Sequence, residues 1–466
     1  MIADLKPYAE HKESGQDWLG SVPAHWSALR AKCLFREVDE RSKTGNEELL
    51  SVSHLTGVTP RRSKTVTMFL AESNVGHKVC QPGDLVINTL WAWMAALGVA
   101  RHAGIVSPAY GVYRPVPGSS ILPDYADHLL RTPLYAAEYQ RCSTGVNSSR
   151  LRLYPEQFLR IPVLAPPLAE QADIMRFLSW ANERLERAIL AKRKVIALLN
   201  EQKQAIIHRA VTRGLDPSVP LKPSGIPWLG DIPQHWRTSR LSQLSTRIGD
   251  GLHGTPQYVD QSPYYFINGN NLVHGNIRLK SSTRCVNEDE FKRYKIALDN
   301  SSVLISINRT IGSVACYRGE SIILGKSAAY INCGKGLARP FLFSFLRSPA
   351  VINFLRQEVT GTTIFNLSLA SIRSLPIALP PVDEQLKIAS AIEGMIAPIG
   401  TAISRLEREI ELLREYRTRL VADVVTGKFD VREAAARLPV EVAPDTTEDN
   451  TDLRLDPESA DEEAAV

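Results

Sequence analysis

The hydrophobic positions of this chain follow two periods, and the one that extends furthest is helical. In the second half, residues spaced by seven are Ile392, Ile399, Leu406, Leu413 and Leu420, and Ile388, Met395, Ala402 and Tyr416 fall between them. In the first half, the matching line is Leu178, Leu185, Leu199 and Ile206, interrupted by Lys192, and the alternate line is Ala181, Ala188 and Val195. This spacing predicts two long helices, each with a coiled-coil seam.

Start and stop signals bound both predicted helices. Prolines precede each one, acids occupy each first turn, and Gly214 and Gly427 follow the last turns. At roughly 40 residues each helix is about 60 Å long, and its apolar stripe needs a partner. The simplest arrangement is an antiparallel pair within one chain; the alternative is that each helix packs separately on its own domain. Pro398 should kink the second helix.

The remaining apolar runs are short and punctuated by glycine and proline, which is typical of strands. Strands are expected within 84–90, 302–308 and 321–332, and a helix is expected in each of 122–142 and 338–357. The uncharged segment 85–100 is shorter than the roughly 20 residues of a spanning helix, so a buried segment is favoured over a membrane span. These elements predict mixed α/β modules with a shared order.

The chain repeats its own sequence. "SGQDWLGSVPAHW" at 14–26 and "SGIPWLGDIPQHW" at 224–236 agree at eight of thirteen positions, 210 residues apart. "PPLAEQADI" and "PPVDEQLKI" begin at Pro166 and Pro380, and "VTRGLD" and "VTGKFD" are also 214 residues apart. The chain is therefore a tandem duplication in which two similar frames carry two modules of different sequence.

The fold class expected is α/β (α+β), with two globular modules separated by a pair of long antiparallel coiled-coil helices in a pseudo-twofold tandem repeat. The segments are 1–26, which completes the frame; 27–163, the first module; 164–216, the central long helix; 217–236, a linker and the start of the second repeat; 237–377, the second module; 378–430, the C-terminal long helix; and 431–466, an acidic disordered tail.

Charge is divided unevenly along the 466 residues. The net charge is +5, yet residues 441–466 carry ten acids and one arginine, which leaves the body strongly basic. A basic body favours a polyanionic partner. The six cysteines are scattered and form no C-x-x-C pair, which indicates free thiols in a reducing compartment such as the cytoplasm.

Motifs for catalysis are missing. "GESIILGKS" at 319–327 has five residues between its glycines where the phosphate loop needs four. We find no dinucleotide glycines, no N/D-P-P-Y/F methyltransferase motif, no clustered zinc ligands and no paired acids with a lysine. The sequence predicts a non-catalytic chain that binds no cofactor and no metal.

Several motifs, taken in order, resemble the specificity subunit of type I restriction–modification systems. They are "WLGxxPxHW" in both repeats, "IPVLAPPLAEQ" and "LPIALPPVDEQ" before the long helices, "GDLVINTLWAWMAALGVA" in the first module, and "SVLISINRTIGSVACY" with "TGTTIFNLSLASIRSLPI" in the second. The resemblance covers residues 14 to 430. The same motif order occurring twice makes it fairly specific, whereas the acidic tail departs from the family.

The resemblance implies two target-recognition domains, each of which reads one half of a bipartite asymmetric site in double-stranded DNA. It implies that the paired helices act as a ruler and as the docking surface for two methyltransferase (modification) subunits, and that restriction/translocase subunits join this core. The complex would be a site-specific adenine methyltransferase and restriction enzyme. S-adenosylmethionine and ATP would be bound by the partners, and no membrane is involved.

The candidate DNA-contacting residues lie in predicted loops, because base edges and phosphates are read by Arg, Lys, amide and hydroxyl groups. They are Arg61, Arg62, Lys64, Asn147, Ser148, Arg150, His253, Thr255, Gln257, Arg309, Thr362, Thr363 and Asn366. A solvated charge cluster or ordinary turn chemistry is the alternative for each of them. The repeated tryptophans Trp18, Trp26, Trp228 and Trp236 are expected to pack between frame and module.

A rival hypothesis is a two-module coiled-coil adaptor that binds protein or glycan without DNA specificity. A carbohydrate binder built by duplication would have the same outline. A third class, a stand-alone nuclease or methyltransferase, conflicts with the missing catalytic motifs.

Overall fold

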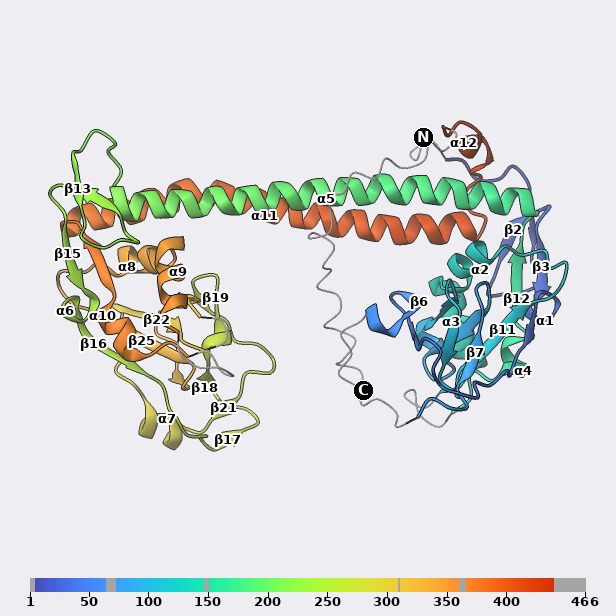
Figure 1. Cartoon of the computed structure of the whole chain (residues 1–466), viewed down its shortest axis with the longest axis horizontal. Helices are drawn as coiled ribbons and strands as arrows, with labels where there is room; N and C mark the ends of the chain where they lie inside the picture. Colours follow the sequence, from blue (N-terminus) through green and yellow to red (C-terminus); the bar gives the residue numbers. More distant parts are fainter. Residues whose placement is uncertain (1–4, 64–72, 146–150, 309–310, 360–365, 440–466) are drawn as a thin grey trace. The chain divides into compact units, whose positions relative to one another are not determined.

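A computed structural model describes residues 5–63, 73–145, 151–308, 311–359 and 366–439 (Figure 1). The chain divides into two compact units. The first unit comprises residues 1–192 and 409–466, and the second comprises residues 193–408. Each unit therefore contains one module and part of both long helices, α5 (Leu168–Arg213) and α11 (Val382–Val425).

The first unit contains the N-terminal segment, the first module and a short C-terminal helix. The predicted disorder of 431–466 is wrong at the start of that segment, because residues 432–436 form a helix and Val431 and Ala435 are buried in the core of this unit. Its strands are β1 (His11–Glu13), β2 (Ser21–Pro23), β3 (Ser27–Arg30), β4 (Phe35–Glu37), β5 (Leu50–Ser53), β6 (Gly57–Pro60), β7 (Lys78–Cys80), β8 (Leu85–Ile87), β9 (Leu97–Val99), β10 (Gly104–Val106), β11 (Gly111–Pro115) and β12 (Pro162–Ala165). Its helices besides the long ones are α1 (Ala31–Leu34), η2 (Arg61–Ser63), η3 (Ala92–Met94), α2 (Pro123–Leu130), α3 (Pro133–Cys142), α4 (Pro155–Phe158) and α12 (Arg432–Ala436).

The second unit follows the same order with additional short strands. Its strands are β13 (Leu221–Pro223), β14 (Asp231–Pro233), β15 (Arg237–Arg240), β16 (Ser245–Asp250), β17 (Tyr258–Val259), β18 (Tyr264–Ile267), β19 (Leu272–Val273), β20 (Asn276–Ile277), β21 (Cys285–Val286), β22 (Ser302–Ser306), β23 (Val314–Cys316), β24 (Ile322–Leu324), β25 (Ala328–Cys333) and β26 (Pro376–Leu379). Its shorter helices are α6 (Leu241–Leu244), η5 (Gly269–Asn271), α7 (Glu288–Tyr294), α8 (Arg339–Leu346), α9 (Pro349–Gln357) and α10 (Leu369–Ser374).

The two modules share one topology despite their different sequences. The central sheet of the first has the order β4-β11-β8-β9, and that of the second has β16-β25-β22-β23. All of these pairings are antiparallel. In both units the strand that enters the module pairs with the strand that leaves it, β3 with β12 and β15 with β26. The expected α/β architecture with a common plan is confirmed.

Each module helix that the sequence predicts as one is in fact two. Residues 122–142 form α2 and α3, and residues 338–357 form α8 and α9. The divisions fall at Arg131-Thr132-Pro133 and Arg347-Ser348-Pro349, where the proline begins the next helix. Proline disfavours helical conformation in the preceding residue, so the chain turns there.

Two ambiguous segments are strands of buried sheets. Residues 85–100 form β8, η3 and β9, and Leu85, Val86 and Leu97 are fully buried. The expectation of a buried segment there is confirmed. "GESIILGKS" contains β24, which pairs in parallel with β18. A strand that is paired in this way is not the loop-to-helix turn that cradles phosphate.

The long helices pair antiparallel in each unit, as the sequence predicts (Figure 1). In the first unit, Lys192 Nζ lies 2.6 Å from Glu409 Oε2, and Arg417 Nη1 lies 3.2 Å from Glu186 Oε2. In the second unit, Ile207 and Val211 of α5 share one apolar core with Ile388 and Ile392 of α11.

The seam departs from the heptad pattern. On α11 the buried isoleucines are Ile388, Ile392, Ile399, Ile403 and Ile410, which form two lines spaced by eleven residues. Met395 and Tyr416, assigned to the seam by their spacing, are 42% exposed, and Val195 of α5 is 44% exposed. An eleven-residue period corresponds to about 3.67 residues per turn, which is close to the value of a straight helix. The apolar stripe therefore winds around the helix axis less than a heptad stripe would. The helix runs uninterrupted through Pro398.

Among the described helices, α11 is long and apolar enough to cross a membrane by length and composition. Its most apolar 18-residue window has a mean hydropathy of 1.3. Helices in the cores of water-soluble proteins also satisfy this criterion. Ile388 and Ile392, in the first half of α11, are buried in the core of the second unit, but only 22% of the apolar window is buried, so most of that window is exposed in this structure.

Candidate functional site

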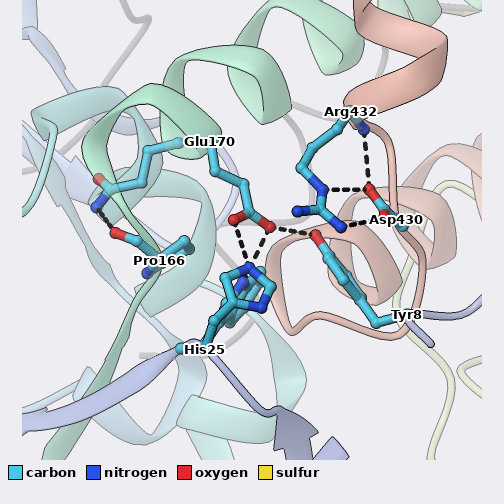
Figure 2. A network of polar contacts seen from close by, with 8 residues as sticks. Tyr8, His25, Pro166, Glu170, Asp430 and Arg432 are labelled. Atoms are coloured by element: carbon cyan, nitrogen blue, oxygen red, sulfur yellow. Dashed lines mark hydrogen bonds and ion pairs between the residues drawn. The ribbon is translucent and has the colours of Figure 1, made fainter. Parts of the chain in front are cut away.

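The repeated motifs build the same polar clamp twice. Trp26 donates its indole N–H to Glu170 Oε1 at 3.0 Å, and His25 Nε2 lies 2.7 Å from Glu170 Oε2 (Figure 2). In the second unit, Trp236 donates to Glu384 Oε1 at 3.0 Å, and His235 Nε2 lies 2.8 Å from Glu384 Oε2. In each unit, the His-Trp pair that ends the "WLGxxPxHW" motif is therefore bound to the glutamate of the later "PPLAEQ" or "PPVDEQ" motif. We call the group around Glu170 the first clamp and the group around Glu384 the second clamp.

The glutamine after each clamp glutamate joins the module to the long helix. Gln171 donates to the Ser120 and Pro166 carbonyls and accepts from the Leu122 N–H. Gln385 donates to Gly336 and Pro380 and accepts from Ala338. Both glutamines are fully buried. Each therefore fixes the segment before α2 or α8 to the start of a long helix.

The tryptophans confirm their expected role as apolar anchors. Trp26 is 0% exposed and Trp236 is 1% exposed. Trp18 and Trp228 are partly buried against the cores of their own units. Since a buried indole needs an acceptor for its N–H, the clamp glutamates also satisfy the polar atoms of Trp26 and Trp236.

The first clamp has an additional layer. Tyr8 donates to Glu170 Oε1 at 2.6 Å, and Arg432 lies over the Tyr8 ring while bonding Asp430 at 2.6 Å (Figure 2). Burial and then the bond to Glu170 raise the pKa of Tyr8. The Asp430 N–H also donates to the Lys6 carbonyl at 2.8 Å. Residues near both chain ends thus meet at this clamp.

In the second module, four segments that are distant in sequence converge at one end of the central sheet. The Leu252 N–H donates to Leu324, and the Ile307 N–H donates to Ser327. The Leu367 N–H donates to Ile307, and Asn308 forms an isolated bridge with Asn366. The polar side chains carried by these segments are His253, Asn308, Lys326 and Asn366, which we call the second loop face. Asn308 Oδ1 is buried without a hydrogen-bond partner among the described residues.

The corresponding end of the first module is assembled in the same way. The Leu153 N–H donates to the Thr89 carbonyl, as Leu367 does to Ile307. Asn88 Nδ2 donates to Tyr110 Oη at 3.1 Å, and Thr89 donates to the Ala109 carbonyl. Burial raises the pKa of Tyr110, and the nearby Arg61 charge opposes that shift. The side chains here are Arg61, Asn88, Tyr110 and Arg152, which we call the first loop face.

The structure brings some sequence candidates to these faces and engages others locally. Arg61 lies on the first loop face, and His253 and Asn366 lie on the second. Arg62 pairs with Glu48 at 2.7 Å but remains 82% exposed. His253 pairs with Asp250 at 2.7 Å. Thr255 and Gln257 are exposed on the loop that carries His253, and the Gln257 N–H donates to Glu290.

The other candidates lie outside the described residues: Lys64, Asn147, Ser148, Arg150, Arg309, Thr362 and Thr363. Their assignment stays a prediction.

Sequence reasoning missed Asn88, Tyr110, Arg152, Asn308 and Lys326. Lys326 belongs to the "GKS" stretch, whose sequence suggests only a phosphate loop. Arg152 lies two residues after Arg150, in the same polar stretch as the candidates Asn147 and Ser148. To recognise from sequence that the β24–β25 turn is equivalent to the β10–β11 turn, the two modules must be aligned. They share too little sequence for that alignment.

All six cysteines are free thiols, as expected. Burial raises the pKa of Cys80 and of Cys333 to about 12, so neither is a reactive thiolate near neutral pH. Within the described ranges, no group of three or more His, Cys, Asp or Glu side chains is arranged to hold a metal ion.

Comparison with known proteins points to one family. Residues 252–412 match a family model described as "Type I restriction modification DNA specificity domain". The chain is 23% identical over 304 residues to the putative type I restriction enzyme MjaX specificity subunit of Methanocaldococcus jannaschii, covering 62% of this chain but only 63% of that relative. It is 20% identical to the EcoKI specificity subunit of Escherichia coli over 75% of each chain. It is also 20% identical to the MjaIX specificity subunit of M. jannaschii over 89% of this chain and 96% of that one.

The fold also has a solved counterpart. A chain from a structure of the type I R-M system, described for its complex assembly and conformational transition, superposes with a TM-score of 0.60. The match covers 87% of this chain and 98% of that chain at 16% identity. At this identity the likeness shows the fold alone.

Proposed function

This chain belongs to the specificity subunits of type I restriction–modification systems, and from that premise we propose that it reads a bipartite, asymmetric site in double-stranded DNA. Residues 27–163 and 237–377 would be the two target-recognition domains. One observation carries the proposal. Two modules with identical sheet order present different side chains at the same end of the sheet. Equivalent scaffolds with different contact residues are what two unlike half-sites require.

The loop faces carry the chemistry for such contacts. Arg61 and Arg152 on the first face suit guanine edges or phosphates, and Tyr110 adds an aromatic surface. Asn366 on the second face is exposed and suits adenine, because an amide can bond its N6 and N7 together. Lys326 suits phosphate or guanine. The candidates outside the described residues flank these same faces in sequence and belong to the proposal.

The paired helices would set the distance between the half-sites and dock two methyltransferase subunits. Leu198 and Leu412, equivalent positions 214 residues apart, are 56% and 48% exposed. One lies in each unit, so each unit offers an apolar anchor for one copy of the same partner. Leu412 also borders a shallow hollow lined by Lys192, Glu409, Leu413, Glu415, Tyr416 and Arg419.

Catalysis would reside in the partners. Methyltransferase subunits would bind S-adenosylmethionine and modify adenine, and restriction/translocase subunits would use ATP. This chain would contribute recognition and assembly in the cytoplasm, without a cofactor of its own.

Exchange of one module tests the proposal. Replacing residues 27–163 with the corresponding module of another family member, in complex with the methyltransferase, should change one half of the methylated sequence and leave the other half intact. The measurement is sequencing of methylated DNA. A change in both halves, or in neither, contradicts modular reading.

A ruler makes a separate prediction. Inserting four residues into each long helix adds about 6 Å, which should widen the tolerated gap by one or two base pairs of about 3.4 Å. An unchanged gap would contradict the proposal that the helices set the spacing, but it would not contradict DNA recognition by the modules. The adaptor alternative predicts binding that changes little with salt, whereas DNA affinity falls steeply between about 50 and 200 mM.

A further inference from the structure

Arg347 occupies an unusual setting at the end of α8 in the second unit. It is the C-cap residue of that helix, and its guanidinium lies over the Phe343 ring at 4.8 Å. The backbone N–H of Arg347 donates to the Ser344 carbonyl at 3.2 Å, but its guanidinium makes no hydrogen bond or ion pair with the described residues. Burial lowers the pKa of Arg347. A partly buried cation without an acceptor is energetically unfavourable unless a ligand supplies one.

The equivalent arginine of the first module shows what a structural role looks like. Arg131 is the C-cap of α2, and "RTP" there matches "RSP" after α8. Arg131 donates to the His54 and Leu55 carbonyls at 3.0 and 2.7 Å, and it lies 3.6 Å from Asp127. Phe343 stands at the position of Asp127, four residues before the arginine. The second module has therefore exchanged the carboxylate for a stacking surface and left the guanidinium edge available.

Other cations gather around Arg347. Lys203 of α5 lies close enough that burial and the Arg347 charge lower its pKa. Burial raises the pKa of Cys316, and Arg339, Arg318 and Arg347 all oppose that shift. Arg339 is engaged by the Tyr317 carbonyl at 2.9 Å. The Glu320 charge adds to the raised pKa of the Cys316 thiol. The Glu320 carboxylate accepts a hydrogen bond from the backbone N–H of Arg318 at 2.7 Å. We call Lys203, Arg318 and Arg347 the basic cluster.

The basic cluster is connected to the second loop face by one hairpin. The β22–β23 turn begins at Asn308 on the loop face, and β23 ends at Cys316, two residues before Arg318. The return limb of the hairpin starts at Gly312, in the turn before β23, and four residue steps of about 3.3 Å each lead from Gly312 to Cys316. The separation of roughly 13 Å corresponds to about four base pairs along a duplex. A duplex that lies on the loop face and runs along this hairpin would carry its backbone within reach of the cluster.

We propose that the basic cluster binds phosphate of the DNA backbone just outside the half-site read by the second module. This rests on the proposed function of the chain. The stacked guanidinium of Arg347 presents its N–H edge, Lys203 brings a charge from the long helix, and Arg318 completes the site from the hairpin. Contacts of this kind add affinity and fix register without reading sequence.

The test measures binding of the full-length chain to two labelled duplexes, one with its methylated target and one with that target scrambled. The affinity for both duplexes should fall by a similar factor in each of the variants Lys203→Gln, Arg318→Gln and Arg347→Gln. Each should also lower the slope of log affinity against log salt by about 1. Lys387→Gln, which removes an exposed charge of α11 in the same unit, is the matched control and should change neither quantity.

A stability measurement separates binding from structure. Lys203→Gln relieves repulsion between like charges, so the thermal midpoint of the free chain should stay constant or rise while DNA binding weakens. A cluster that only stabilises the fold would lower the midpoint instead. Arg347→Lys keeps the charge but not the stacked fork, and it should recover part of the salt slope that Arg347→Gln loses.

Three outcomes overturn the proposal. Unchanged affinity and salt slope in all three variants, with target preference intact, would refute the cluster and leave the proposed function standing. A changed preference between duplexes would mean that the cluster reads bases. Loss of methyltransferase assembly with normal DNA binding would make it a protein contact. If the unaltered chain fails to discriminate the duplexes, the proposed function itself fails.

Discussion

The indole N–H of Trp26 donates to Glu170 Oε1 at 3.0 Å across 144 residues of sequence. This bond joins the start of the first module to the first turn of a long helix, and Trp236 and Glu384 repeat it. The two clamps differ in burial. Glu170 has a side chain 5% exposed and accepts from Tyr8, Trp26 and His25, whereas Glu384 is 29% exposed and lacks the tyrosine.

Neutralising the two clamp glutamates should therefore have unequal effects. Glu170→Gln leaves several buried donors facing an amide and should lower the free energy of unfolding by about 2–3 kcal/mol. Glu384→Gln should lower it by about 1 kcal/mol, because water reaches that site. Denaturant unfolding measures both. Glu183→Gln, on a pair that is 66% exposed on each side, is the control, and equal losses at both clamps would contradict this account.

The glycines that end the long helices give a second matched pair. Both have positive φ, +82° at Gly427 and +74° at Gly214. A Cβ at Gly427 would lie 2.6 Å from Pro23 and 3.0 Å from Trp26, while one at Gly214 would meet Trp236 at an ordinary 3.4 Å. Gly214→Ala should cost about 1 kcal/mol from backbone strain. Gly427→Ala should cost clearly more, because the first clamp must shift. A smaller loss at Gly427 in thermal unfolding would refute this ranking.

The exposed leucines of the long helices predict a stoichiometry. Leu412→Glu or Leu198→Glu should each remove one methyltransferase subunit from the reconstituted complex, and the double variant should remove both, since a charge opposes apolar docking. Light scattering after size-exclusion chromatography reports the mass. Leu279→Glu, at another leucine 41% exposed, should assemble normally. Full assembly of the double variant would place the docking surface elsewhere.

Two partly buried histidines predict loss of stability in acid. Burial lowers the pKa of His128 and of His208, and His208 Nδ1 has no partner among the described residues. The unfolded state therefore binds more protons once the pH falls below about 6.5, so the stabilisation is complete above that pH and declines below it. Between about pH 7 and 5, the denaturation midpoint should fall less steeply in His128→Gln and in His208→Gln than in the unaltered chain. The same slope in both variants as in the unaltered chain would exclude these histidines as the cause of the acid sensitivity.

Part of the candidate site followed from the sequence. The sequence predicts Arg61, His253 and Asn366 in loops that the structure brings to the loop faces, because turn residues and polar clusters are local signals. Lys326 and Tyr110 were missed, because they reach the same faces from turns whose positions depend on strand pairing. Arg347 was missed for a related reason: its significance emerges only beside Arg131, and the residues that contact the two arginines differ.

The sequence by itself determined the duplication, the two long helices and the mixed α/β modules, since hydrophobic spacing and helix-ending residues are encoded within a few turns of chain, whereas it left the pairing of the long helices open. Tertiary structure decided which isoleucines form the seam, which glutamate holds each tryptophan, and which loops share a face. These depend on sheet register and helix packing between residues that are often more than a hundred positions apart, and no local pattern of residues specifies such contacts.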